Sequence, residues 1–160
     1  MSATATPVAS LYDWLMFLHV LAAMVWVGGV VALIALGRYA VGSGEHEAVA
    51  RFVGSLRRVL PLVLGPSSTL VLLLGIWMVL DSPAWGFGQT WVWLALALLA
   101  AAVLVGMLAA ARSSRAAEAA VAAGDHGQAV RQLRRWTWAI GLIVLLLVVA
   151  TWDMVFKPGS

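Results

Sequence analysis

The sequence predicts an all-α integral membrane protein, built as a four-transmembrane-helix antiparallel bundle. Of its 160 residues, 63% are hydrophobic and 11% are charged, whereas an ordinary soluble domain has about 25% charged residues. A chain of this length cannot hide so much apolar surface from water, and its mean hydropathy of +0.98 agrees with this. The nine tryptophans beside two tyrosines also favour a membrane, because tryptophan concentrates at the membrane interface.

Four stretches are long and apolar enough to cross a bilayer, which takes about 20 predominantly apolar residues. They lie near 11–37, 59–80, 91–111 and 136–156. No lysine or arginine precedes the first stretch, and its apolar run outlasts that of a signal peptide, so we expect this span to be retained. The whole of 1–160 is therefore predicted to form a single four-helix transmembrane domain.

The basic residues indicate the orientation. Nine of the ten lysines and arginines fall in the loops that follow the first and third spans, and such residues concentrate in cytoplasmic loops. We therefore expect both termini on the outer side (N-out, C-out). Trp136 and Trp138 then lie at the inner edge of the fourth span, where we expect them to act as interfacial anchors.

Both cytoplasmic loops carry helical patterns. Apolar residues from Val49 to Leu60 recur with helical spacing, which predicts an amphipathic helix that runs into the second span. In the other loop, Asp125 stands three residues before Gln128, as in a capping box that starts a helix. The helices are therefore expected to extend into the cytoplasm.

The second and third spans carry packing signals. Pro61 and the pair Gly65-Pro66 predict a kink in the inner half of the second span. The short loop 81–90 predicts that these two spans are antiparallel neighbours. In the third span small residues recur at every fourth position, a pattern that lets another helix come close. This seam predicts either a contact within the chain or a homodimer face, and it consists of Ala102, Gly106 and Ala110.

Composition also excludes several classes of function. The chain has no cysteine, which excludes disulfides, iron–sulfur clusters, thiolate metal sites and covalent c-type haem. Its net charge of +3 comes from basic residues that set the orientation of the chain in the membrane. No nucleic-acid partner is therefore expected, and the expected partner is the lipid bilayer. We find no phosphate-binding loop, no nucleophile–histidine–acid order and no zinc-binding helix motif, so a hydrolase or a kinase is not expected.

His19 is the main candidate for a functional residue. It lies about eight residues into the first span, on the order of 12 Å below its outer edge, and an ionisable group inside a span is by default a functional hypothesis. Ala22, Ala23 and Trp26 share its helical face, so a neighbouring helix or a flat ligand can approach closely. Its imidazole is suited to bind haem iron or copper, to relay a proton, or only to bridge two helices.

Other polar and sulfur-containing residues gather near the outer ends of the spans. Methionine with histidine is a soft donor set suited to copper(I), and the methionines concerned are Met16, Met78 and Met154. Asp13 and Asp153 lie at the same side; Asp153 is expected to accept a proton from His19, to pair with Lys157 or to contact lipid headgroups.

The two cytoplasmic loops resemble each other. Gly44-Glu45-His46 and Gly124-Asp125-His126 are offset by 80 positions, which is half the chain. Either a two-plus-two duplication or coincidence explains the likeness. The two histidines can share a metal only if their loops touch, and since loop histidines are usually solvated, no site is expected there.

The run Leu18-His19 followed by Trp26-Val27-Gly28-Gly29 resembles the first span of a group of small bacterial membrane proteins. The group includes the copper-resistance D family, an uncharacterised four-span predicted integral membrane protein family, and the haem-dependent protoporphyrinogen oxidase of bacteria. Pro61, Gly65-Pro66 and the ending 153–159 resemble the uncharacterised four-span family most.

The resemblance implies a multi-pass cell membrane protein located in the bacterial inner membrane. It also implies a haem or metal role for His19. Trp26, Gly28 and Gly29 match the same motif and are implied to line the cofactor site. The oxidase also relies on a basic residue in a later span, and the second and third spans contain no lysine or arginine. Protoporphyrinogen oxidase activity is therefore not expected.

Three functions remain open from the sequence. The first is a membrane protein that binds haem b or a redox metal through His19, open towards the outer face. The second is a non-catalytic structural or interaction subunit in which His19 bridges helices. The third is copper passage through His19 and the methionines.

Overall fold

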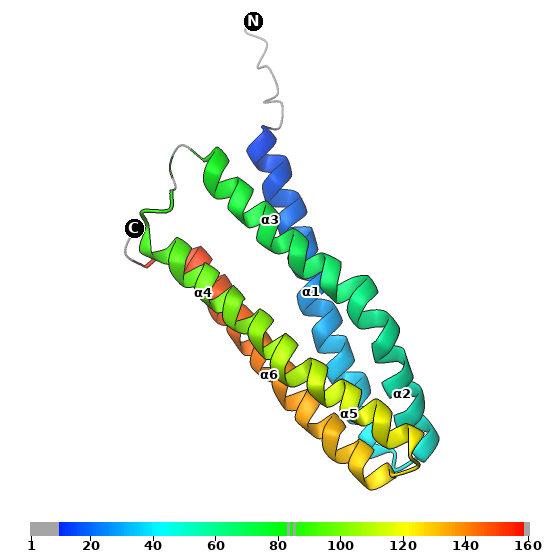
Figure 1. The fold of residues 1–160 in the computed structure, drawn as a ribbon. Helices are drawn as coiled ribbons and strands as arrows, with labels where there is room; N and C mark the ends of the chain where they lie inside the picture. The colour runs from blue at the N-terminus through cyan, green and yellow to red at the C-terminus, as the bar shows by residue number, and fades with distance from the viewer. Residues whose placement is uncertain (1–9, 83, 85, 159–160) are drawn as a thin grey trace, which may run out of the picture.

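The fold is an all-helical bundle, as the composition predicted. The computed structural model describes residues 10–82, 84 and 86–158. In this part of the chain, four helices are long and apolar enough to span a membrane (Figure 1). They run from Leu11 to Gly42, from His46 to Asp81, from Thr90 to Ala122 and from His126 to Phe156. The protein is thus a four-helix membrane bundle.

Two of the long helices contain a π-helical turn and are labelled in pieces. The first and fourth long helices are α1 (Leu11–Gly42) and α6 (His126–Phe156). The second is made of α2 (His46–Val59), the π-turn η1 (Leu60–Leu64) and α3 (Gly65–Asp81). The third is made of α4 (Thr90–Val105), the π-turn η2 (Gly106–Ala110) and α5 (Ala111–Ala122).

The helices pack as two pairs joined by a central contact. Helix α3 packs on α1, helices α4 and α5 pack on α6, and α1 contacts α6. At the end away from the termini, α2 reaches α1, α5 and α6. The α1–α3 pair and the α4–α6 pair diverge towards the end at which α1 begins and α6 finishes (Figure 1), while the contacts of α2 close the opposite end. Following the predicted orientation, we call the diverging end the outer end and the closed end the inner end.

The second and third spans are not the close neighbours that the short loop predicted. Among the described helices, α3 packs mainly on α1 and α4 mainly on α6. Both contacts use small residues. An added Cβ at Gly75 of α3 would meet α1, and Ala95 and Ala102 of α4 are buried. Close backbone approach at small residues, rather than loop length, therefore decides which helices pair.

The small-residue seam of the third span is a contact within the chain. Ala102 and Ala110 are buried, and a Cβ added at Gly106 would lie 3.7 Å from Cδ1 of Ile143 on α6. The seam thus seats α4 and η2 against α6. A homodimer stays a prediction, and these three residues already serve the α6 contact.

The proline-containing part of the second span forms the π-turn η1, where the sequence predicted a kink. The N–H of Gly65 donates to the carbonyl of Leu60, five residues back. After Pro66, the hydroxyl of Ser67 donates to the carbonyl of Val63 at 2.7 Å. Val63 lies four residues before Ser67, so this is the hydrogen bond that serine hydroxyls in helices often make to the carbonyl one turn back. The proline-containing segment thus forms a π-turn rather than a break in the helix.

Both inner loops behave as their patterns predicted. The buried side chains of α2 are Val49, Phe52, Val53 and Leu56, which form the expected amphipathic face. The carboxylate of Asp125 accepts a hydrogen bond from the backbone N–H of Gln128 at 2.8 Å and caps α6. The helices therefore continue past the apolar spans, as expected.

Trp136 is not an interfacial anchor. Its side chain is fully buried, with 0% exposed, whereas Trp138 is 82% exposed. The ring of Trp136 meets that of Phe52 edge to face, with centroids 5.8 Å apart, and lies beside Gly37 of α1. Two residues along a helix point to different faces, so only Trp138 has the position of an anchor.

The orientation is tested by cysteine labelling, because the chain has no cysteine of its own. Ala84 and Ala123 are exposed at opposite ends of the bundle. A membrane-impermeant maleimide should label Ala84→Cys on intact cells and should label Ala123→Cys only after the membrane is opened. The reverse pattern would contradict the N-out, C-out prediction.

Candidate functional site

His19 sits in the outer half of the bundle, on the face of α1 that turns towards the other helices. Leu15, Ala22 and Trp26 share this face and are buried, and the imidazole itself is half-buried. A Cβ added at Gly75 would lie 3.2 Å from Cε1 of His19 and 3.6 Å from Nδ1. The absence of a side chain at position 75 thus makes the room that the imidazole occupies.

The polar atoms of this imidazole are poorly satisfied. The backbone of Val71, one turn before Gly75 on α3, makes a weak hydrogen-bonding interaction with the ring. Nδ1 is buried and has no well-formed hydrogen bond. A buried polar atom without a partner costs free energy, so the burial of this nitrogen calls for an explanation by function or by packing.

Asp153 is the most deeply buried charged residue of the described chain. Its side chain is 0% exposed, and neither carboxylate oxygen has a hydrogen-bond partner. The hydrogen bonds to His19 or Lys157 that the sequence suggested are therefore not formed. The ammonium of Lys157 instead lies 5.6 Å from the ring centre of Trp91.

His19 and Asp153 nevertheless lie at about the same height in the bundle. Gly37 on α1 and Trp136 on α6 are in contact, since a Cβ at Gly37 would lie 3.7 Å from the Trp136 ring. His19 is 18 residues before Gly37 and Asp153 is 17 residues after Trp136, which is about 27 Å and about 26 Å along antiparallel helices. The outer half of the bundle thus holds two ionisable groups at one level.

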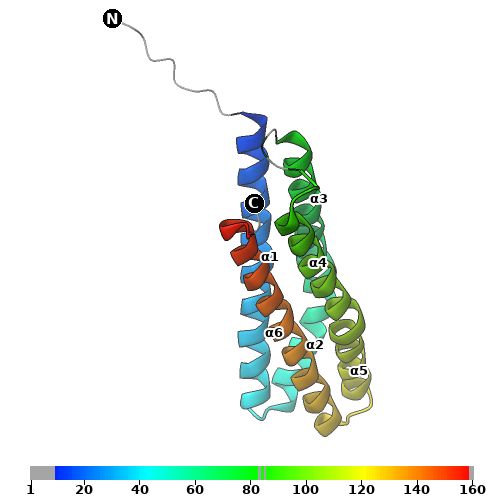
Figure 2. The same ribbon diagram turned by 90° about the vertical axis from the view of Figure 1, so that its left-hand side faces the viewer.

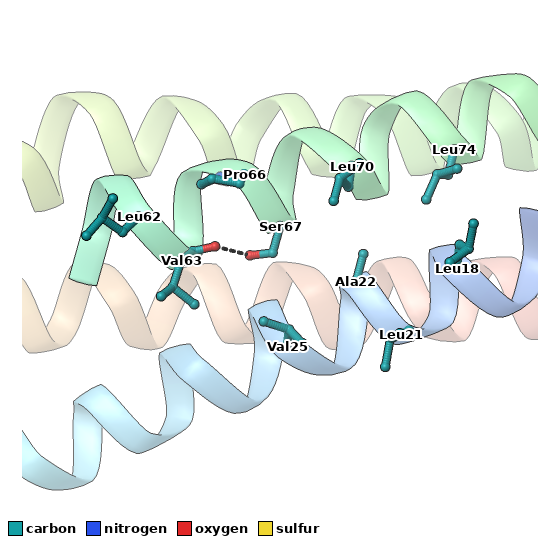
Figure 3. A pocket seen from close by; sticks show the side chains of 10 residues that line it. All are labelled: Leu18, Leu21, Ala22, Val25, Leu62, Val63, Pro66, Ser67, Leu70 and Leu74. Carbon is teal, nitrogen blue, oxygen red and sulfur yellow. Dashed lines mark hydrogen bonds between the residues drawn. The ribbon is translucent and has the colours of Figure 1, made fainter. Parts of the chain in front are cut away.

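An apolar groove lies between α1 and the η1–α3 segment, and His19 itself is not among the residues that line it. Its volume is about 400 Å³. Leu18 and Ala22, which flank His19 on α1, line it, together with Pro66 and Ser67 from the other side (Figure 3). Ser67 is the one polar residue among those that line it, and its hydroxyl is bonded to Val63. The groove therefore presents an almost wholly apolar surface.

The other residues implied for a cofactor site are dispersed. Trp26 is a buried core residue. Gly28 has open space where a side chain would be, whereas a Cβ at Gly29 would lie 3.0 Å from Leu64 of η1. Gly29 thus serves the packing of the π-turn on α1, and Gly28 faces outwards.

None of the three methionines predicted as copper donors has a buried side chain. Met16 and Met154 are exposed, at 42% and 36%, and Met78 is half-buried. Asp13 is used locally, because its Oδ2 accepts hydrogen bonds from the backbone N–H and the hydroxyl of Ser10, both at 2.8 Å. Within residues 10–82, 84 and 86–158, no group of three or more His, Asp or Glu side chains forms a metal cluster.

One pairing at the inner end differs from the expectation that these loop histidines are solvated and separate. The rings of His46 and His126 are stacked, with centroids 3.7 Å apart and planes 27° apart. The signal that could have located this pair is the repeated glycine–acid–histidine run in the two loops. If the runs correspond, then the loops occupy equivalent places and their histidines meet.

Comparison with known proteins gives a family. A family model described as "Predicted integral membrane protein (DUF2269)" matches residues 13–158. No curated protein and no solved structure matches the chain. The match includes His19, Gly75 and Asp153, and it extends almost to Gly159, the end of the C-terminal motif, which lies outside the described residues.

Proposed function

The chain belongs to the DUF2269 family of predicted integral membrane proteins, and we propose that it binds haem or a redox metal through His19 in the outer half of the membrane. The observation that carries this proposal is the half-buried imidazole whose Nδ1 has no well-formed hydrogen bond. Idle ionisable groups are rare inside a membrane because they are costly there. A bound group of this kind would supply one-electron chemistry.

The surroundings of His19 support haem more than copper. The groove of about 400 Å³ that starts at Leu18 and Ala22 has the apolar character of a site for a flat macrocycle. His19 does not line this groove, so haem binding there requires its imidazole to turn away from Gly75. Imidazole is the most common protein ligand of haem iron. The copper route through Met16, Met78 and Met154 is less well supported, since two of these thioethers point outwards.

A second candidate is a structural or interaction subunit. It is favoured by the contact of His19 with Gly75 and by its interaction with the backbone of Val71, which together bridge α1 and α3. In that case His19 contributes to helix packing and binds nothing. No reaction is proposed for the chain, and the second and third spans contain no basic residue.

The experiment is a visible spectrum with iron and copper analysis of the protein purified in mild detergent. We expect a Soret band, or haem uptake on reconstitution, and His19→Ala should abolish or shift the band because the ligand nitrogen is lost. The matched control is His126→Ala, which should leave the band unchanged because this residue lies at the inner end.

Two outcomes separate the candidates. Protein that is colourless, metal-free and unable to take up haem or copper would reject the ligand proposal. If His19→Ala then lowers the melting temperature of that protein, the helix-bridging function is supported. A Soret band that survives in His19→Ala would mean that a different residue binds the iron.

A further inference from the structure

The stacked histidines at the inner end join two turns that are far apart in the sequence. His46 is the first residue of α2 and His126 is the first residue of α6. Helix α2 packs against both α5 and α6 at this end, and the α1–α2 and α5–α6 turns both lie here (Figure 2). The two imidazoles are the polar part of this contact, with ring centroids 3.7 Å apart.

The glycines of the two turns have the same backbone conformation. Gly44 and Gly124 have the same positive φ of 72°, a conformation that glycine adopts readily and other residues rarely adopt. Each glycine is followed by an acidic residue and then by the histidine that begins the next helix. The likeness between the loops is therefore one of structure as well as of sequence, and it places one histidine from each half of the chain side by side.

A small pocket lies next to the two rings. Its volume is about 140 Å³, which is room for an ion with a few of the water molecules that occupy about 30 Å³ each. Its floor is apolar, since Val49 and Ala129 line it and are each 1% exposed. His46 is exposed and His126 is half-exposed, so an ion can reach the pocket from the solvent and the rings are free to turn.

We propose that His46 and His126 form a two-histidine site for a divalent late-transition-metal ion, such as Zn²⁺, Ni²⁺ or Cu²⁺. Imidazole nitrogen suits these ions. Two nitrogens that each lie about 2.0–2.1 Å from one tetrahedral ion are about 3.4 Å apart and point at the ion from different directions. The two stacked rings must therefore turn out of their parallel arrangement until one nitrogen of each faces the pocket.

The local charges act in both directions on a cation at this place. The positive ends of α2 and α6 oppose it, but three carboxylates lie within one residue of the histidines: Glu45, Glu47 and Asp125. Glu47 is paired with Arg51, and Asp125 uses Oδ1 to cap α6. Glu45 makes no capping hydrogen bond, but it does not form a three-residue cluster with the two histidines, so it acts on the ion through its charge and water completes the coordination.

The test is a Zn²⁺ titration of the full-length protein in detergent, by calorimetry and by equilibrium dialysis. We expect about one Zn²⁺ per chain and a higher melting temperature with Zn²⁺. The variants His46→Phe and His126→Phe keep an aromatic ring in the stack but remove the donor nitrogens. Each should weaken binding at least about tenfold, the scale of loss seen when even a supporting partner of a metal ligand is removed.

The controls separate this site from the one at His19. His19→Ala should bind Zn²⁺ as the parent does, so the two proposals fail independently. Glu45→Gln should weaken binding while Glu118→Gln, on α5, should not. The inference is overturned if the parent protein binds no Zn²⁺, or if both phenylalanine variants retain its affinity and stoichiometry. Melting temperatures measured without Zn²⁺ show whether the variants are folded.

Discussion

Trp136→Ala is expected to lower the free energy of unfolding by about 3–5 kcal/mol, the usual loss when a buried aromatic side chain is truncated. The indole is 0% exposed and packs between Phe52 of α2 and Gly37 of α1. It therefore holds three helices together at the inner end. Its Nε1 has no hydrogen-bond partner, so the loss comes from packing alone.

The matched control for this prediction is Trp138→Ala, two residues along the same helix. Trp138 is 82% exposed, and its removal should change the stability little in detergent. Both variants are compared by thermal melting in the same detergent. Equal effects of the two substitutions would contradict the burial of Trp136 between the helices.

Asp153→Leu is expected to raise the stability of the bundle by about 1–4 kcal/mol, as replacing buried charges with apolar residues of similar shape often does. Leucine has the same branched shape, with methyl groups in place of the two oxygens. Both oxygens of Asp153 are buried and without a hydrogen-bond partner, so their desolvation is uncompensated. The measurement is the melting temperature of the detergent-purified protein.

Asp81→Leu is the control, because Asp81 also lies at the outer end but is exposed; no comparable gain is expected there. A fall in stability for Asp153→Leu would mean that the carboxylate has a partner that offsets its burial. A gain accompanied by loss of the His19-dependent spectrum would connect Asp153 with the site at the same height. A carboxylate kept at the cost of stability is typical of functional positions.

The course of the helices followed well from local sequence patterns. The second span was expected at 59–80, and the helix that contains it runs from His46 to Asp81, extended inwards by the amphipathic segment that Val49 to Leu60 indicated. The start of α6 was expected from Asp125, and its side chain does cap that helix. Such signals depend on neighbours within a few residues, so they can be recognised without the fold.

Which helices pack on one another could not be predicted from local sequence patterns in the same way. The loop 81–90 is short, yet α3 packs on α1, because Gly75 accepts the His19 ring there. Trp136 and Trp138 look alike as a pair of tryptophans near a span end, and only the position of α1 and α2 buries the first of them. In each case the outcome depends on a surface that another part of the chain provides.

The sequence by itself determined that this chain is a membrane protein and how many membrane-spanning helices it has. It also determined which residue inside the first span is worth testing. Apolar length and the scarcity of charge decide these points, and both can be counted along the chain. Only the tertiary structure decided that His19 faces Gly75 beside an apolar groove, that Asp153 is buried at the same height, and that His46 and His126 stack. The contacts of His19 with Gly75 and of His46 with His126 join residues 56 and 80 positions apart. Which helices meet depends on where their backbones can approach closely, as at Gly75.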